Sequence, residues 1–145
     1  MSVVPSQILY LEHGSTRLYA EAIQVIEARH LCWARPTLLI QGLPVEADAA
    51  SRQAAIALAA ANPVATTLSL YDLEEAPDLI WPLELFQIAY DIDFFSILVQ
   101  LKISPNEMTP QSGHEQLSRF IRSFWHTHPA AFQSTSRELS STSAR

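Results

Sequence analysis

The most regular hydrophobic pattern of the chain lies in its first third. Two runs at residues 17–26 and 31–40 are rich in β-branched and aromatic residues, and the polar link 27–30 separates them. Because the link contains no Gly, Asn or Asp, a two-residue turn with positive φ is not expected. The pattern predicts a long β-hairpin that is closed by a loop of about three residues, 28–30.

This loop fixes the register of the hairpin, since side chains alternate between the two faces of a strand. One predicted face is apolar apart from Gln24 and is expected to point into the core; it holds Leu18, Ala20, Ala22, Ile26, Cys32, Leu38 and Ile40. The opposite face mixes aromatic, aliphatic and charged side chains; it holds Tyr19, Glu21, Ile23, Val25, Trp33, Arg35, Thr37 and Leu39. Glu21 and Arg35 are expected to lie diagonally opposite each other there.

This mixed face is too apolar to be an ordinary solvated face of an antiparallel sheet. One interpretation is that helices of the same chain cover it. The other is a protein–protein surface, because Trp, Tyr and Arg are enriched among the residues that dominate binding energy. The predicted partner-binding residues are Tyr19, Glu21, Ile23, Val25, Trp33 and Arg35.

The middle of the chain predicts a helix and a third strand. Asp48 can cap an alanine-rich helix over residues 49–61, and Asn62 with Pro63 can end it. Leu68 and Leu70 then alternate with polar residues in a predicted strand, 65–73. A helical crossover implies that this strand lies parallel to the second strand of the hairpin.

The last third predicts helices. Apolar residues recur at helical spacing over 78–90, residues 94–101 are apolar on most sides, and an amphipathic helix begins near Ser112 and ends before Pro129. The predicted fold class is therefore α/β (α+β): a small mixed sheet with a long β-hairpin, an alanine-rich crossover helix and C-terminal helices packed on it.

One of these helices indicates self-association. A helix that is apolar all round is normally buried, and a domain of this size has little material with which to surround the segment 94–101. A partner subunit is the other way to cover it, so a homodimer is expected.

Composition and charge limit the possible partners and the compartment. The 145 residues are 48% apolar and carry a formal net charge of −6, which favours a single globular domain over residues 1–132 followed by a disordered Ser/Thr-rich tail at 133–145. Residues 72–93 contain seven acids and no base, so nucleic acid is not an expected partner. No apolar run is long enough for membrane insertion, and a cytoplasmic location is expected.

The sequence contains no recognisable catalytic motif. A glycine-rich phosphate loop, a nucleophile elbow and a His-Glu-x-x-His pattern are absent, and Cys32 is the sole cysteine. No catalytic residue, metal site or cofactor is therefore predicted. The expected function is a non-catalytic protein-binding module, an adaptor or assembly chaperone for a larger intracellular complex. The alternative is a small enzyme with a pocket between sheet and helices.

Four short runs carry a resemblance to a known group of proteins. They are 21–26, 31–36, 78–82 and Leu85 with Phe86, and they resemble small cyanobacterial proteins without assigned enzymatic activity. Among small cyanobacterial assembly factors, the chaperone of carboxysome shell proteins is the first resemblance to test. That resemblance implies a dimeric α/β adaptor that binds a peptide of its client protein.

Overall fold

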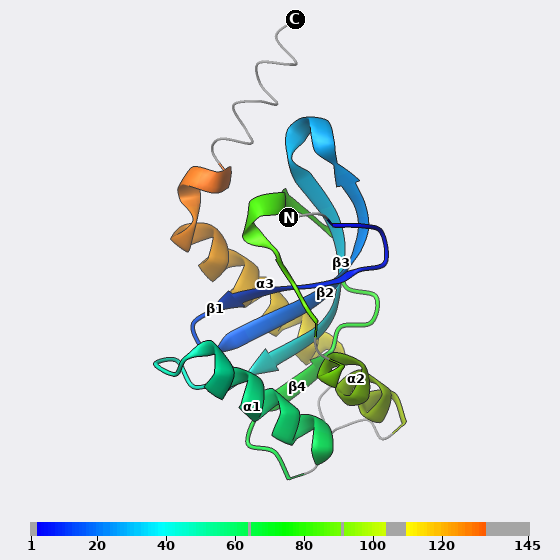
Figure 1. The fold of residues 1–145 in the computed structure, drawn as a ribbon, viewed down its shortest axis with the longest axis vertical. Coiled ribbons are helices and arrows are strands. Elements are labelled where there is room, and N and C mark those ends of the chain that lie inside the picture. Colours follow the sequence, from blue (N-terminus) through cyan, green and yellow to red (C-terminus); the bar gives the residue numbers. More distant parts are fainter. Residues whose placement is uncertain (1–2, 64, 91, 104–109, 133–145) are drawn as a thin grey trace, which may run out of the picture.

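The computed structural model describes residues 3–63, 65–90, 92–103 and 110–132, and Figure 1 shows a mixed α+β fold in which helices pack on both faces of one sheet. The predicted fold class is confirmed. The predicted tail at 133–145 lies outside the described residues.

Over the described residues the sheet has six strands, and every pair is antiparallel. The strands are β1 (Ile8–His13), β2 (Thr16–Ile26), β3 (Leu31–Gln41), β4 (Ser69–Asp72), β5 (Leu79–Pro82) and β6 (Gln87–Ile88). Their order is β4-β3-β2-β1-β6, and β5 pairs with β3 next to the hairpin loop. The long strand β3 therefore has two short neighbours, β4 and β5, along one edge.

Among the described residues, three long α-helices pack around the sheet: α1 (Ala49–Ala61), α2 (Asp93–Ile103) and α3 (Pro110–Thr127). Residues 129–132 are also helical. The helix α3 packs on one face of the sheet through Leu117, Phe120 and Phe124. The helices α1 and α2 contact each other and share the opposite face. Two short 3₁₀ turns, Glu27–Arg29 and Leu83–Leu85, lie between strands.

The long hairpin is confirmed, but its loop differs from the prediction. The loop has four residues, because Ile26 pairs with Leu31, and it contains a 3₁₀ turn. His30 closes the turn with a φ of +54°, and its backbone N–H donates to the carbonyl of Glu27 at 3.2 Å. Histidine is one of the non-glycine residues that adopt this left-handed conformation more often, which the composition of the link did not reveal.

The predicted faces of the hairpin are wrong over part of its length. The β2–β3 register shifts between Tyr19 and Ala20, and again between Ala22 and Gln24. A bulge moves every following side chain to the other face. As a result Leu39 packs with the α3 side, whereas Leu38 and Ile40 pack with the α1 side. The second shift also places Gln24 opposite Trp33 rather than on the core face.

The alanine-rich helix forms as predicted, but it is not a parallel crossover. The side chain of Asp48 caps α1 by accepting from the backbone N–H of Ser51 at 2.8 Å. The chain then returns to the end of the sheet from which it left, because Ser69 pairs with Gln41. The strand β4 therefore runs antiparallel to β3, and it covers 69–72 rather than 65–73.

The helix predicted over 78–90 is also wrong. The segment forms β5, the turn Leu83–Leu85 and the two-residue strand β6. In β5 the buried side chains of Leu79 and Trp81 flank the exposed Ile80, which is the two-residue period of a strand. Pro82, which lacks a backbone N–H, disfavours a helix through this segment.

Candidate partner-binding surface

The sheet face that carries α1 and α2 has two unlike halves. In the covered half, Tyr19, Leu38 and Ile40 are 0% exposed beneath the two helices. The ring of Tyr19 lies 5.2 Å, centroid to centroid, from the ring of Phe94 on α2. Tyr19 was predicted to bind a partner, and its burial removes it from any surface that a partner can reach.

The open half lies nearer the hairpin loop, beyond the residues that α1 and α2 bury. We define the open sheet face by five side chains that are exposed or half-buried: Glu21, Gln24, Trp33, Arg35 and Ile80. The strand register brings them together, because Glu21 is opposite Arg35, while Trp33 is flanked by Gln24 on β2 and Ile80 on β5. An aromatic, an aliphatic and a charged group thus form one exposed cluster.

Asp78 fixes the geometry of this face. Its carboxylate accepts a hydrogen bond from the indole Nε1 of Trp33 at 2.8 Å and one from Nε of Arg35 at 3.2 Å. Burial acts to raise the pKa of Asp78, but the hydrogen bonds from Trp33 and Arg35 and the charge of Arg35 outweigh it, so the pKa is lowered. The hydrogen bond to Asp78 likewise raises the pKa of Arg35.

Two other predicted residues are placed differently. Ile23 lies within the second register shift of β2, and Val25 pairs with Cys32, whose side chain packs on the α3 side. Val25 therefore does not belong to the open sheet face. Sequence reasoning missed Asp78 and Ile80, because it assigned their segment to a helix. Residues 79–82 are apolar throughout, so the alternation around Ile80 is visible in the burial of the side chains and not in the sequence.

A charged cluster at the other end of the same face is structural in character. Arg17 is 2% exposed, its guanidinium contacts Glu12 at 3.1 Å, and it donates to the hydroxyl of Tyr19 at 3.1 Å. Its Cζ lies 4.2 Å from the ring centroid of Tyr10. Nε of Arg52 on α1 approaches the same carboxylate oxygen of Glu12 at 3.3 Å.

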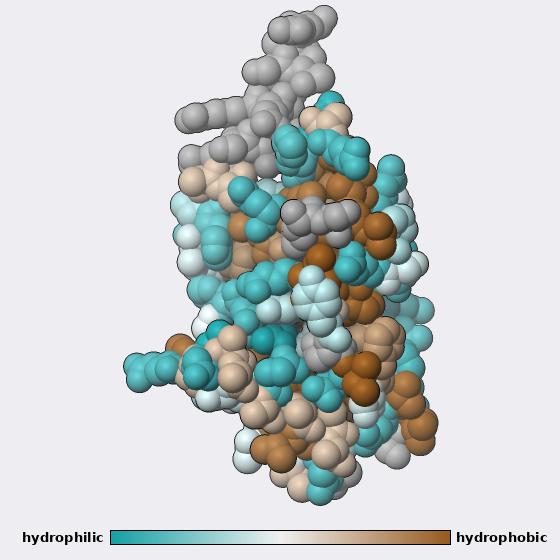
Figure 2. Space-filling model, viewed as in Figure 1, coloured by the Kyte–Doolittle hydropathy of each residue, from teal (hydrophilic) through white to brown (hydrophobic). Residues whose placement is uncertain are grey.

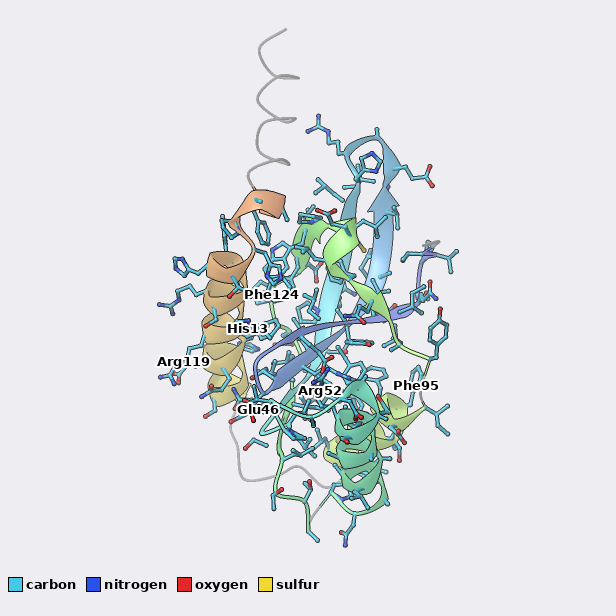
Figure 3. All side chains as sticks on the ribbon, turned by 60° about the vertical axis from the view of Figure 1, so that its left-hand side comes forward. His13, Glu46, Arg52, Phe95, Arg119 and Phe124 are labelled. Atoms are coloured by element: carbon cyan, nitrogen blue, oxygen red, sulfur yellow. The ribbon has the colours of Figure 1, made fainter. Side chains whose placement is uncertain are left out.

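The protonation of this cluster follows from its contacts. Burial acts to lower the pKa of Arg17, but Tyr19 and Glu12 outweigh it and the pKa is raised. The guanidinium is therefore charged, and its partners are held in place beneath α1. Figure 3 shows Arg52 on this side of the sheet and Phe124 on the opposite side, in α3.

The pocket required by the enzyme alternative was expected between sheet and helices. Among the described residues, a hollow of about 350 Å³ lies between α1 and the segment that follows it, and it is lined by Ala55, Leu58, Asn62, Ala65, Thr66, Thr67 and Leu68. None of these side chains is an acid or a base. Cys32 is buried, and burial raises the pKa of its thiol, so it is poorly suited to act as a nucleophile.

The search for metal ligands and membrane spans covers the described residues. Within these ranges, no three His, Cys, Asp or Glu side chains are grouped as ligands of a metal ion would be. Among the helices of the same residues, none combines the length and the apolar character that crossing a membrane requires.

Comparisons with known proteins give no match. Neither a family model, nor a curated protein, nor a solved structure resembles the chain closely enough to be assigned.

Proposed function

We propose that this protein is a non-catalytic protein-binding module, an adaptor or assembly chaperone of the cytoplasm, and that the open sheet face binds a partner protein or a peptide of a client protein. The observation that supports the proposal is the cluster of the half-buried Trp33 with the exposed Arg35 and Ile80 on one face of the sheet. The sequence-based resemblance makes carboxysome shell proteins of cyanobacteria the first clients to test.

The chemistry of the cluster suits such a role. Trp and Arg provide large contact areas and directional hydrogen bonds, and they are enriched among the residues on which binding energy depends. Asp78 holds both side chains in one orientation. A preorganised surface loses less conformational entropy when a partner binds. The adjoining Glu21 and Gln24 supply a polar rim around the apolar centre.

The test is a pull-down from native cell extract with tagged wild-type protein and with Trp33→Ala, followed by titration of the purified partner. We expect Trp33→Ala to weaken binding by about 2 kcal/mol or more. Trp125→Ala is the matched control, because Trp125 on α3 is 55% exposed and lies on the other side of the sheet. The control is expected to retain the partner.

Arg35→Ala is a second probe of the same surface. It is expected to weaken binding without unfolding the chain, because the side chain of Arg35 is 54% exposed. A partner that binds both variants with wild-type affinity would exclude the open sheet face. The search for a binding surface would then move to the rest of the acidic segment 72–93, away from Asp78 and Ile80.

A further inference from the structure

The strand β5 contributes to both faces of the sheet. Ile80 is 56% exposed on the open sheet face, whereas Leu79 and Trp81 are 6% and 7% exposed and pack in the core on the α3 side. Asp78 directly precedes the strand and accepts the two hydrogen bonds that orient the largest side chains of the open sheet face. The position of β5 therefore decides where Asp78 and Ile80 lie.

The backbone of β5 has limited support. Among the described residues this short strand pairs with β3 alone, and Pro82 at its end has no N–H to donate. In Figure 1 the hairpin and the green segment 79–88 share the upper part of the molecule, and Figure 2 shows apolar side chains over the same part. A short strand that is paired on one side depends on such packing for its stability.

An aromatic cluster on the α3 side holds Trp81. Its ring stacks on the ring of Phe124, with 5.4 Å between the centroids and 28° between the planes. The ring of Phe132 meets it edge to face, at 5.1 Å and 86°. Aromatic pairs favour both arrangements. Phe124 belongs to α3 (Figure 3), whereas Phe132 lies beyond the end of that helix, so two separate elements cover Trp81.

The chain brings Phe132 into this cluster by interrupting α3. The helix ends at Thr127, and residues 129–132 form a further helical turn. Because proline disfavours the helical conformation of the residue before it, Pro129 interrupts the helix at His128. Figure 1 shows the turn in orange beside the green segment that contains β5. The turn therefore lies against β5 and carries Phe132 with it.

We propose that Phe132 is a positioning residue of the open sheet face, because it closes over Trp81 and thereby holds β5 against β3. This role rests on the partner-binding function proposed for that face, and it adds a means of regulating it. When the turn 129–132 leaves Trp81, β5 loses one of its two aromatic covers. Asp78 then no longer orients the side chains that donate to it. Docking of the turn and binding of a partner are therefore coupled.

A movement of β5 acts directly on the contacts of Asp78. The donors Trp33 and Arg35 lie on β3, whereas the acceptor directly precedes β5. A shift between the two strands therefore lengthens both hydrogen bonds. Local opening costs less free energy than global unfolding where few contacts are broken. The turn can thus leave Trp81 while the rest of the fold stays intact.

The first test needs no partner and measures amide exchange of Phe132→Ala and wild type. We expect the backbone amides of residues 79–83 to exchange about tenfold faster or more in the variant, because local opening there is easier. The amides of β1 and α1 are expected to keep their rates. Phe132→Leu retains an apolar cover over Trp81, so it is the matched control and is expected to exchange like wild type.

The second test follows the titration of the Asp78 carboxyl by NMR. Burial acts to raise its pKa, but the contacts with Trp33 and Arg35 outweigh this and lower it. In Phe132→Ala we expect the pKa of Asp78 to move up toward the ordinary Asp value of about 3.9. Phe94→Leu reduces a buried ring on the other face of the sheet, and it is expected to leave this pKa unchanged.

Partner binding is the third measurement. For a partner captured by the wild type, Phe132→Ala is expected to raise the dissociation constant about threefold or more, and Phe132→Leu is expected to bind like wild type. Trp125→Ala removes a ring that stacks on Phe132 at 5.1 Å but leaves the contact between Phe132 and Trp81. Trp125→Ala is therefore still expected to retain the partner.

Each outcome supports or overturns the positioning role. Wild-type exchange of residues 79–83 in Phe132→Ala overturns it, and so does an unchanged pKa of Asp78. Faster exchange spread evenly over all strands also overturns it, because Phe132 then stabilises the whole fold. If Trp33→Ala releases the partner while Phe132→Ala keeps wild-type affinity, the coupling fails and the proposed function stands. If no partner binds through the open sheet face, the proposed function fails, and the first two tests still decide whether Phe132 positions β5.

Discussion

Tyr19 and Trp33 are predicted from the sequence to lie on the same face of the same hairpin, yet their surroundings are opposite. Tyr19 is 0% exposed and packs on Phe94, whereas Trp33 is half-buried and donates its indole hydrogen bond to Asp78 on the surface. The difference arises because β2 and β3 extend beyond the residues that α1 and α2 bury. One sheet face therefore serves as core over the covered half and as surface over the open half.

Arg17 in the covered half and Arg35 in the open half show the same contrast for one type of side chain. Arg17 is 2% exposed and is held by Glu12 and Tyr19, while Arg35 has a side chain that is 54% exposed and is held by Asp78. The buried contact is protected from solvent and salt, and the exposed one is screened. The same residue type is thus part of the buried fold in one half and exposed to solvent in the other.

We expect the largest loss of stability from Phe94→Ala, which lies in the covered half. Phe94 is 2% exposed and lies between α2 and the covered half, so its truncation leaves a cavity against Tyr19. We expect the free energy of unfolding to fall by about 3–5 kcal/mol, measured by urea denaturation. A loss no larger than that of the exposed neighbour variant Phe95→Ala would show that the covered half is not a packed core.

The second prediction compares Arg17→Met with Arg35→Met. Arg17→Met removes the hydrogen bond from the guanidinium to the buried hydroxyl of Tyr19 and one of the two cations beside Glu12, so we expect a loss of about 2–3 kcal/mol in the free energy of unfolding. Arg35→Met is expected to have a much smaller effect. Equal losses in the two variants would contradict the assignment of Arg35 to an exposed surface.

The sequence was a good guide where a periodic pattern was long. The hairpin, the capped helix α1 and the amphipathic stripe of α3 were all predicted, because each spans many residues and carries its own end signals. The short strands β5 and β6 were not. A run of four residues such as 79–82 fits helical and strand periods about equally well, and its pairing with β3 is a tertiary contact.

The candidate site was predicted only in part for the same reason. Trp33, Arg35 and Glu21 were correctly grouped, and they remain on the open sheet face. The two register shifts leave no signal in the alternation of residue types along the sequence. One of them lies next to Thr37, whose hydroxyl donates to the carbonyl of Tyr19 at 3.0 Å. The burial of Tyr19 depends on where α2 lies, and local periodicity carries no information on that position.

The third prediction concerns the stability of the open half itself. Trp33→Ala removes a half-buried ring and its hydrogen bond to Asp78, and we expect a loss of about 1–2 kcal/mol in the free energy of unfolding. This is smaller than the loss expected for Phe94→Ala. If Trp33→Ala instead unfolds the protein, Trp33 is part of the core.

We expect the smallest change in the free energy of unfolding from Asp78→Asn, and the characteristic sign of this change is that it depends on pH. The pKa of Asp78 is lowered in the folded protein, so its carboxylate stabilises the fold above the ordinary Asp value of about 3.9. That contribution is lost as the pH falls through the lowered pKa. Asp78→Asn can still accept from Trp33, but it has no charge for Arg35 at any pH.

We therefore expect wild type to be slightly more stable than Asp78→Asn at pH 7, and the difference to shrink as the pH falls below about 4. Urea midpoints of both proteins, measured at a series of pH values from neutral to acid, report this difference, because all other carboxylates titrate in both chains. The control repeats the comparison with Arg35→Met present in both proteins. There we expect the stability difference between Asp78 and Asp78→Asn to depend less on pH. A difference that stays constant from pH 7 into the acid range would show that Arg35 and Asp78 do not interact in solution, and that the open sheet face is not preorganised by this contact.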